Sequence, residues 1–317
     1  LKVASRGNAL VYSVAADKDA AILAGGHAAD GAFWISEKSG RWSTCSYYST
    51  ASQNLLRAYN NTQSYNADND AVEKLAEACI NDMGMGRDNI TDLLSITLSA
   101  KVKDITNWQT DMEIAYIKLD KTLAQIISTI ENKVGEGNVL FVVTSTGYTA
   151  DQPVDYGKYK IPTGTFYINR TANLLNMYLS AIYGQARYVE TCYHNQIYLD
   201  HKLIEQKRLS LNEMMSRSKE LLLQAAGVRN VSYSPYSSEV SGDLLIEVAP
   251  GWQLVNEDNH ENYTSRAAFV PFPIIFYGAA TKAERVITPA TVDRIAPTIA
   301  KAIRIRAPNA CSAAPLH

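Results

Sequence analysis

The stretch from residue 138 to residue 147, which reads NVLFVVTSTG, constrains the fold more than any other part of the chain. Its consecutive apolar residues lack the alternation of a half-buried strand. Uninterrupted apolar runs of this length are typical of central strands in α/β sheets that are covered on both faces. Open α/β sheets bind their ligands at the carboxyl ends of such strands. The polar residues Thr144, Ser145 and Thr146 are therefore expected at a functional edge, although none of them is a good metal ligand.

A strand, a long helix and this apolar run follow one another with short connections. The sequence predicts a strand at 92–98 and an amphipathic helix at 112–134, which ends at Gly135 and Gly137. This order predicts a parallel, right-handed βαβ unit in which an apolar stripe of the helix faces the sheet. The stripe consists of Ile114, Ile117, Leu119, Leu123, Ile126, Ile127 and Ile130.

The rest of the chain alternates between short apolar runs and segments with helical periodicity. Further strands are predicted at 10–16, 32–35, 41–48, 228–233, 243–248 and 272–277, and further helices at 70–83, 172–183, 210–226 and 291–303. No internal repeat or flexible linker separates independent halves. We therefore expect one large α/β/α sandwich over residues 1–317, with an inserted excursion at about residues 25–70.

Charge and hydropathy exclude several classes of partner. The formal net charge of −2 gives no electrostatic footprint for nucleic acid and no polybasic anchor for a membrane surface. No apolar run approaches the roughly 20 residues of a membrane-spanning helix. The cysteines have no zinc-type spacing, so buried or idle thiols are favoured over one disulfide.

Motifs for familiar chemistry are sparse. His27 follows two glycines and precedes Asp30, a pairing that could bind a metal or relay a proton, but a histidine that caps a turn is the favoured interpretation. His194, His201 and His260 are isolated in sequence, and no helical zinc spacing is present. Neither a nucleophile elbow nor a Walker loop occurs.

Several sequence segments, taken in order along nearly the whole chain, resemble the alkaline phosphatase superfamily. The resemblance is in particular to the phosphate-irrepressible monoesterase branch with a threonine nucleophile. The segments include AILAGGHAADGAFWIS, GNVLFVVTSTG, IPTGTFYIN, NQIYLDHKLIEQK, SGDLLIEVAPGW and VPFPIIFYG. The resemblance implies a three-layer α/β/α sandwich with a mostly parallel central sheet, and a periplasmic or exported location.

The same resemblance implies that the bimetal site is dismantled. Where the family has an Asp-His zinc pair after the apolar strand, this chain has Ser145 and Thr146, and hydroxyls are poor zinc ligands. Lys101 and Lys103 stand where the family's second zinc site should follow the strand at 92–98, and lysines repel a dication.

Few candidates for metal ligands are left, and the positions that clamp substrate are altered too. Asp104 and His260 are the candidates for residual metal ligands. Asp17 and Asp19 fall near the family's substrate-clamping Lys and Arg, where carboxylates would repel a phosphate dianion. The candidate cleft residues are therefore Asp17, Asp19, His27 and Asp30.

The resemblance also begins partway into the family's domain, so we expect the N-terminal part, with its first strand and nucleophile, to be missing from this chain. The leading interpretation is a pseudo-phosphatase without cofactor that binds a ligand or protein partner. The alternative is a zinc-dependent phosphatase or phosphodiesterase with ligands rewired to His27, Asp30, Asp104 and His260, and a nucleophile in the missing segment. A third interpretation is an envelope subunit whose sheet is completed by that segment or by another chain.

Overall fold

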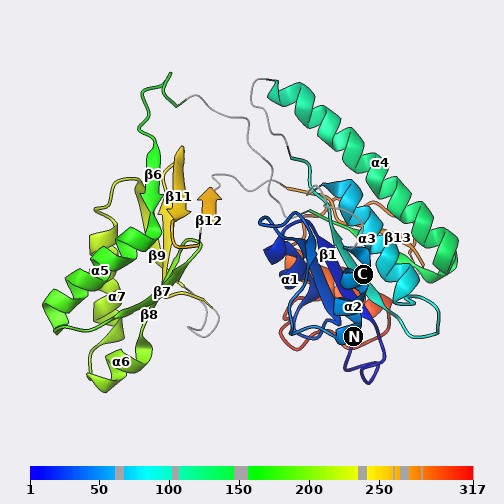
Figure 1. Cartoon of the computed structure of the whole chain (residues 1–317), viewed down its shortest axis with the longest axis horizontal. Coiled ribbons are helices and arrows are strands. Elements are labelled where there is room, and N and C mark those ends of the chain that lie inside the picture. The colour runs from blue at the N-terminus through cyan, green and yellow to red at the C-terminus, as the bar shows by residue number, and fades with distance from the viewer. Residues whose placement is uncertain are drawn as a thin grey trace. The chain divides into compact units, whose positions relative to one another are not determined.

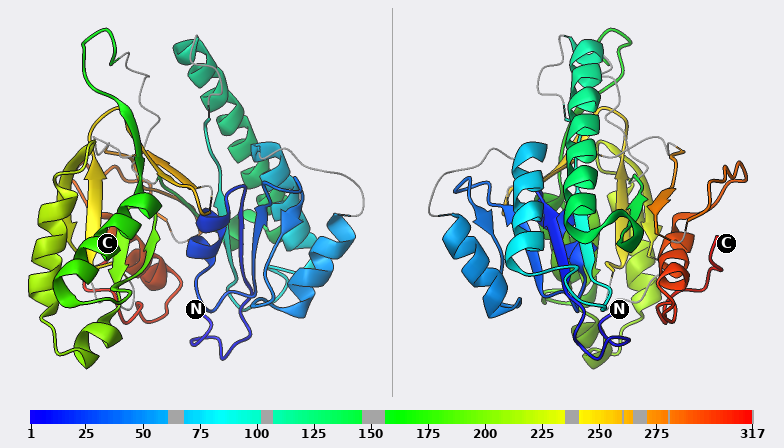
Figure 2. Two further views of the ribbon diagram at one scale, coloured as in Figure 1. Left: turned by 60° about the vertical axis from the view of Figure 1, so that its left-hand side comes forward. Right: turned by 90° about the vertical axis from the view of Figure 1, so that its right-hand side faces the viewer.

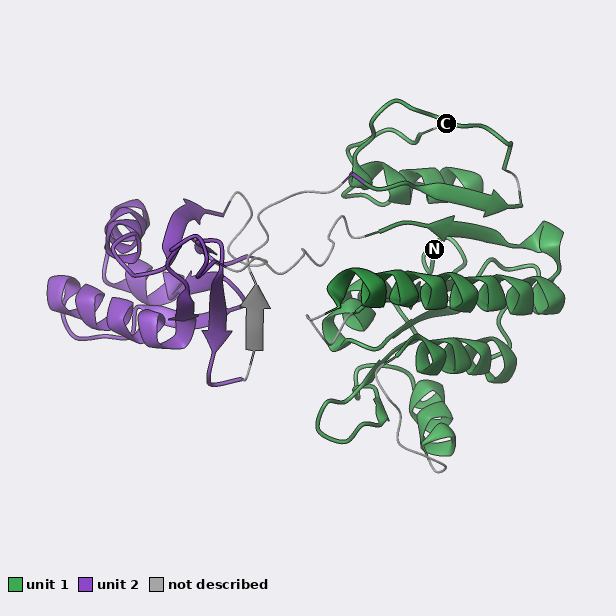
Figure 3. Ribbon diagram, turned by 90° about the horizontal axis from the view of Figure 1, so that it is seen from above, with its two compact units in different colours: residues 1–145, 272–317 green, residues 146–271 purple. Residues whose placement is uncertain are grey.

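The computed structural model describes residues 1–60, 68–101, 107–145, 156–234, 241–259, 261–264, 271–279 and 281–316. These residues group into two compact units, Leu1–Ser145 with Phe272–His317 (unit 1), and Thr146–Pro271 (unit 2), which are coloured separately in Figure 3. The single domain expected over residues 1–317 stays a prediction. None of the described helices is long and apolar enough to cross a membrane.

The largest sheet of unit 1 has four strands in the order β3-β2-β1-β4. They are β1 (Val11–Ala15), β2 (Gly31–Ile35), β3 (Trp42–Ser43) and β4 (Leu93–Thr97). β1 pairs in parallel with both β2 and β4, whereas β3 is antiparallel to β2. Every residue of β1 and β2 is buried, as their apolar composition predicts. β2 matches the strand predicted at 32–35 and is a core strand, and the excursion expected at about residues 25–70 stays a prediction.

Four helices accompany this sheet: α1 (Lys18–Gly25), α2 (Thr50–Tyr59), α3 (Asn69–Asp82) and α4 (Trp108–Val134). α3 buries its apolar stripe, including Val72 and Leu75, in a core shared with Val14 and Phe33 of the sheet. Figure 1 shows α4 beside α3. The Thr129 hydroxyl on α4 donates to Glu77 of α3 at 3.0 Å, which joins the two helices near the carboxyl end of α4.

The apolar run that anchored the sequence prediction forms β5 (Leu140–Val143), preceded by the short helix η1 (Glu136–Asn138). Among the described residues β5 pairs with β13 (Ile275–Gly278) in an antiparallel two-stranded sheet, apart from the four-stranded one. The prediction of a central strand covered on both faces is therefore wrong for these residues, because all four residues of β5 are only partly buried. The C-terminal part of unit 1 adds η2 (Val292–Arg294) and α8 (Ile295–Ala302).

In the described part of unit 2, two sheets and three helices surround a separate core. An antiparallel sheet has the order β7-β8-β10-β9, and a smaller one the order β12-β11-β6. The elements are β6 (Gly164–Tyr167), α5 (Ile168–Tyr183), β7 (Val189–Tyr193), β8 (Gln196–Leu199), α6 (His201–Gln206), α7 (Leu211–Leu222), β9 (Val228–Tyr233), β10 (Leu244–Val248), β11 (Trp252–Asn256) and β12 (Glu261–Thr264). Leu175 and Leu179 of α5 and Met214 of α7 are fully buried in this core.

Candidate functional site

The parallel pairing of β1 with β4 brings two sets of candidate residues to one edge of the sheet. Ala15 at the end of β1 is in register with Thr97 at the end of β4. Asp17 and Asp19 follow β1 directly, and Lys101 follows β4 within a few residues. This carboxyl edge is the place where open α/β sheets bind ligands.

Asp17 uses its carboxylate to begin α1. Its Oδ1 accepts a hydrogen bond from the Ala20 N–H at 2.9 Å, which is the N-cap interaction. Asp19 lies in the first turn of the same helix, where the exposed N–H groups and the helix dipole favour a negative charge. The structure therefore places both expected cleft residues at the carboxyl edge, and it gives them a role in starting a helix.

The end of β4 is fixed by the amide of Asn69, at the start of α3. Asn69 Nδ2 donates to the Ser99 carbonyl at 3.0 Å, and Asn69 Oδ1 accepts from the Ser99 N–H at 2.9 Å. Lys101 is exposed just beyond this clamp. The side chain of Lys101 is therefore in contact with solvent.

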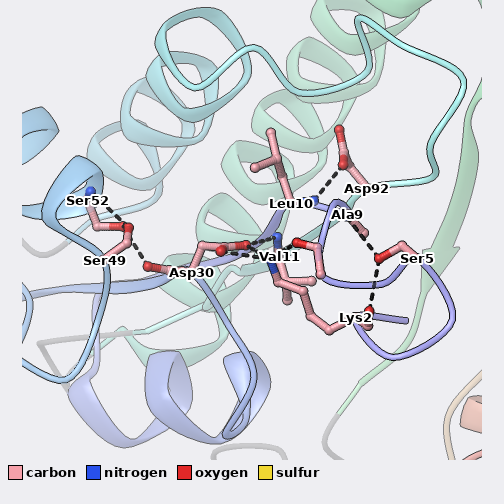
Figure 4. A network of polar contacts seen from close by, with 10 residues as sticks. Lys2, Ser5, Ala9, Leu10, Val11, Asp30, Ser49, Ser52 and Asp92 are labelled. Atoms are coloured by element: carbon pink, nitrogen blue, oxygen red, sulfur yellow. Dashed lines mark hydrogen bonds and ion pairs between the residues drawn. The ribbon is translucent and has the colours of Figure 1, made fainter.

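Asp30 and His27 lie at the opposite, amino edge of the sheet. Asp30 immediately precedes β2, and its Oδ2 accepts from the N–H of Val11, the first residue of β1, at 2.8 Å. Its carboxylate also forms an ion pair with Lys2 at 2.7 Å, and Figure 4 shows both contacts. His27 is exposed, and its carbonyl accepts from the Tyr47 hydroxyl. Asp30 therefore joins the N-terminal segment to two strands and does not share a cleft with Asp17.

The same edge contains Tyr12, a titratable group whose pKa is clearly shifted. Burial is the main cause that raises the pKa of Tyr12 to about 12, and the nearby Asp30 carboxylate adds to it. Hydrogen bonds with Ser52 and Ser49 lower the pKa in part. Tyr12 stacks on Phe33 inside the core, so this shift reflects packing and identifies no reactive group.

The described donors do not fit a pair of zinc ions. Ser145 is exposed, and the Thr144 hydroxyl beside it donates at 3.5 Å to the Ser145 carbonyl. Within the described ranges, no three His, Cys, Asp or Glu side chains are grouped so that they could hold a metal ion. Thr146, Lys103, Asp104 and His260 lie outside the described residues.

Unit 2 contains a titratable pair that sequence reasoning missed. His201 Nε2 lies 2.7 Å from Asp243 Oδ1, and Asp243 is buried while His201 is about one-third exposed. The other carboxylate oxygen of Asp243 accepts from the Leu199 N–H at 2.7 Å. The two residues are 42 positions apart, so no local motif could have indicated their contact.

The four cysteines all lie within the described residues, and the structure joins none of them in a disulfide. Cys79 is completely buried in the core of unit 1, and burial raises the pKa of its thiol to about 12. Such a thiol is neutral at ordinary pH and is no candidate nucleophile or metal ligand.

Known proteins with similar sequences are phosphatases by name, with one exception. Alkaline phosphatase PafA of Elizabethkingia meningoseptica is 22% identical over 397 residues, covering 100% of this chain and 72% of that protein. Alkaline phosphatase PhoV of Synechococcus elongatus is 21% identical, covering 98% of this chain and 70% of that protein. A protein of Myroides odoratus described as a calcium-transporting ATPase is 22% identical over 404 residues, covering 100% of this chain and 73% of that protein.

Structure and family comparisons agree with these relatives. The crystal structure of wild-type PafA superposes with a TM-score of 0.71 at 21% identity, covering 99% of this chain and 75% of that chain. This match confirms the expected alkaline-phosphatase-type α/β fold. The family model described as type I phosphodiesterase / nucleotide pyrophosphatase matches residues 6–268. The chain therefore belongs to the type I phosphodiesterase / nucleotide pyrophosphatase family, within the alkaline phosphatase superfamily.

Proposed function

We propose that this chain is a non-catalytic member of the family, a pseudo-phosphatase that acts by binding a ligand or protein partner. The observation that carries the proposal is the use of Asp17. Its carboxylate caps α1 at 2.9 Å from the Ala20 N–H, at a position where the resemblance places a cation that would clamp phosphate.

Charge at the carboxyl edge supports the same proposal. Asp17 and Asp19 bring negative charge to the edge, which opposes binding of a phosphate dianion. Exposed Lys101 brings positive charge to a position where the resemblance places a zinc ligand, and Ser145 offers only a neutral hydroxyl. Substrate and metal are thus both disfavoured at the described positions.

The names of the relatives favour a second candidate, a zinc-dependent phosphatase or phosphodiesterase with rewired ligands. It would draw on His27, Asp30, Asp104 and His260. The contacts of Asp30 with Lys2 and the Val11 N–H argue against its recruitment, since a ligand must be released from such partners before it can coordinate. Zinc would also require its ligands at about 2.0–2.2 Å from one ion.

Metal content and turnover, measured together, test the proposal. The protein is dialysed against zinc, its bound metal is counted by mass spectrometry, and hydrolysis of p-nitrophenyl phosphate and bis-p-nitrophenyl phosphate is followed. PafA serves as the positive control. We expect no stoichiometric zinc and no hydrolysis above that of a His27→Ala/His260→Ala variant. Two tightly bound zinc ions with turnover that this variant loses would establish the phosphatase instead.

We extend the proposal to a periplasmic or exported location, which is supported by the resemblance to an exported family. Fractionation of source cells, followed by immunoblotting of the periplasmic and cytoplasmic fractions, tests the location. Recovery in the cytoplasmic fraction alone would contradict it.

A further inference from the structure

The chain leaves unit 1 and returns to it at one pair of strands. β5 and β13 are antiparallel, and Val143 at the end of β5 lies opposite Ile275 at the start of β13. Unit 1 breaks off at Ser145, just after β5, and resumes at Phe272, just before β13. In both views of Figure 2, unit 2 is the continuous green-to-gold part of the ribbon, whereas unit 1 combines blue to teal with orange to red. Unit 2 is therefore inserted between two paired strands, and domains that tolerate such insertions have their ends close together in the same way.

Unit 2 pairs its first described strand with strands from near its end. β6 lies parallel to β11, with Gly164 opposite Trp252 and Tyr167 opposite Val255. β11 pairs in turn with β12, which is the last described strand of the unit. The Trp252 indole reinforces this junction, because its Nε1 donates to the Pro162 carbonyl at 3.0 Å. The beginning and the end of unit 2 are thus joined by hydrogen bonds within the unit.

Side chains beside this sheet make the same connection. Arg170 near the start of α5 forms a bidentate ion pair with Glu257, directly after β11, and both N–O distances are 2.6 Å. The buried Asn169 donates from Nδ2 to Asp258 Oδ1 at 3.1 Å. The partners in these two contacts are 87 and 89 positions apart in sequence. The contacts therefore constrain unit 2 as a whole and not one element within it.

Each unit also has a hydrophobic core made of its own residues. The buried core of unit 2 consists of residues between Phe166 and Leu254. The two buried clusters of unit 1 consist of residues between Tyr12 and Met85. A core of its own is what allows a span of ordinary domain size, about 50–250 residues, to fold by itself.

We propose that unit 2 is an inserted folding module, which folds and unfolds independently of unit 1 within the intact chain. Its core, the pairing of its end strands and the Arg170–Glu257 ion pair are all internal, so unfolding of unit 1 removes none of them. Unfolding of unit 2 leaves unit 1 with a long loop between β5 and β13, and the entropic cost of closing a loop grows only slowly with its length. This independence stands whether or not the carboxyl edge of unit 1 is catalytic.

Independent folding makes the chain respond to ligands one unit at a time. A ligand stabilises the folded state that it binds. One that binds at the carboxyl edge of unit 1 therefore raises the stability of unit 1 and leaves that of unit 2 unchanged. Unit 2 can then open and close by local unfolding while the sheet of unit 1 stays intact.

Fluorine NMR of the intact chain tests the proposal, because the four tryptophans are divided between the units. Trp34 and Trp42 are buried in unit 1, and Trp252 packs against the core of unit 2. The chain is labelled with 5-fluorotryptophan, and the Trp252 signal is assigned with Trp252→Phe. The folded-state signals of the three residues are then followed through a urea series.

Two variants separate the transitions of the units. Asp243→Ala removes the acceptor of the Leu199 N–H in unit 2, and Asp30→Ala removes the acceptor of the Val11 N–H in unit 1. We expect Asp243→Ala to raise the unfolded-to-folded ratio at least about fivefold for the Trp252 signal alone. Asp30→Ala should have the corresponding effect on the signals of unit 1 alone.

Exposed Glu205→Gln in unit 2 and Asp120→Ala in unit 1 are the controls. If an alanine variant is too unstable to purify, Asp243→Asn or Asp30→Asn replaces it, since each keeps an acceptor. A variant in one unit that shifts the signals of the other unit more than its control does would overturn the proposal. Such a result would instead support one cooperative domain over residues 1–317.

Discussion

Asp243 holds His201 by a contact of 2.7 Å across unit 2, from the turn before β10 to the first residue of α6. The carboxylate also accepts the Leu199 N–H, which is buried at the end of β8. The Asp243 side chain therefore connects the start of β10 with β8 and α6, and each of its carboxylate oxygens makes one of these contacts.

Removing this carboxylate should destabilise unit 2. Asp243→Ala leaves the buried Leu199 N–H without its acceptor, so we expect the free energy of unfolding to fall by about 1–3 kcal/mol. Asp243→Asn keeps an acceptor and should recover part of the loss. Urea unfolding measures the effect, with exposed Glu205→Gln on α6 as the control. If Asp243→Ala lowers the free energy of unfolding no more than Glu205→Gln does, the structural role of Asp243 is contradicted.

Gly227 is required by its contact with Trp252. It has φ of +84°, and a Cβ at this position would lie 2.1 Å from Trp252 Cε3. The indole is itself held by a bond from Nε1 to the Pro162 carbonyl at 3.0 Å, so it cannot move freely. Gly227→Ala should therefore lower stability by at least about 1–3 kcal/mol through overpacking and backbone strain.

Thermal unfolding of Gly227→Ala and of a matched variant tests this contact. Gly137 in η1 has no atom within 4 Å of the corresponding Cβ position, so Gly137→Ala is the control. We expect a clearly lower melting temperature for Gly227→Ala alone. Equal melting temperatures for the two variants would refute the steric argument.

Elements with a local signal were predictable from sequence. The helix expected at 210–226 begins where predicted, because Ser210 Oγ accepts from the Glu213 N–H at 3.3 Å and forms the N-cap. The buried strands β1 and β2 likewise follow from short apolar runs. In these cases the residues that determine the element lie within it.

Long-range pairing was not predictable in the same way. The apolar run of β5 is typical of a central strand, but its partner β13 comes from a distant part of the sequence, and no local pattern specifies that pairing. The candidate site shows the same limit. His27 and Asp30 are close in sequence to Asp17, yet the parallel strands place them at the amino edge of the sheet.

Asp30 should behave as an anchor. Asp30→Ala removes the ion pair with Lys2 and the acceptor for the Val11 N–H, so we expect the free energy of unfolding to fall by about 1–3 kcal/mol. Asp30→Asn keeps the acceptor and should cost less. Urea unfolding is compared with exposed Asp120→Ala on α4. A loss of bound zinc without any loss of stability would instead identify Asp30 as a metal ligand.

Tyr12 should make unit 1 sensitive to alkali. Burial is the main cause that raises its pKa from 10.0 to about 12, so the phenol is neutral in both states below pH 10 and its contribution to stability is complete there. Between about pH 10 and 12 the unfolded chain ionises first, and stability falls as pH rises, by up to about 3 kcal/mol for this shift. Tyr12→Phe cannot ionise and should flatten the decline.

Urea unfolding from pH 9 to 11.5 measures the difference, with the half-exposed Tyr116→Phe as control. Because Cys79, whose pKa burial also raises to about 12, is present in every variant, its alkaline contribution cancels in the comparison. A wild-type slope equal to that of Tyr12→Phe would mean that Tyr12 ionises with equal ease in the folded and unfolded chain.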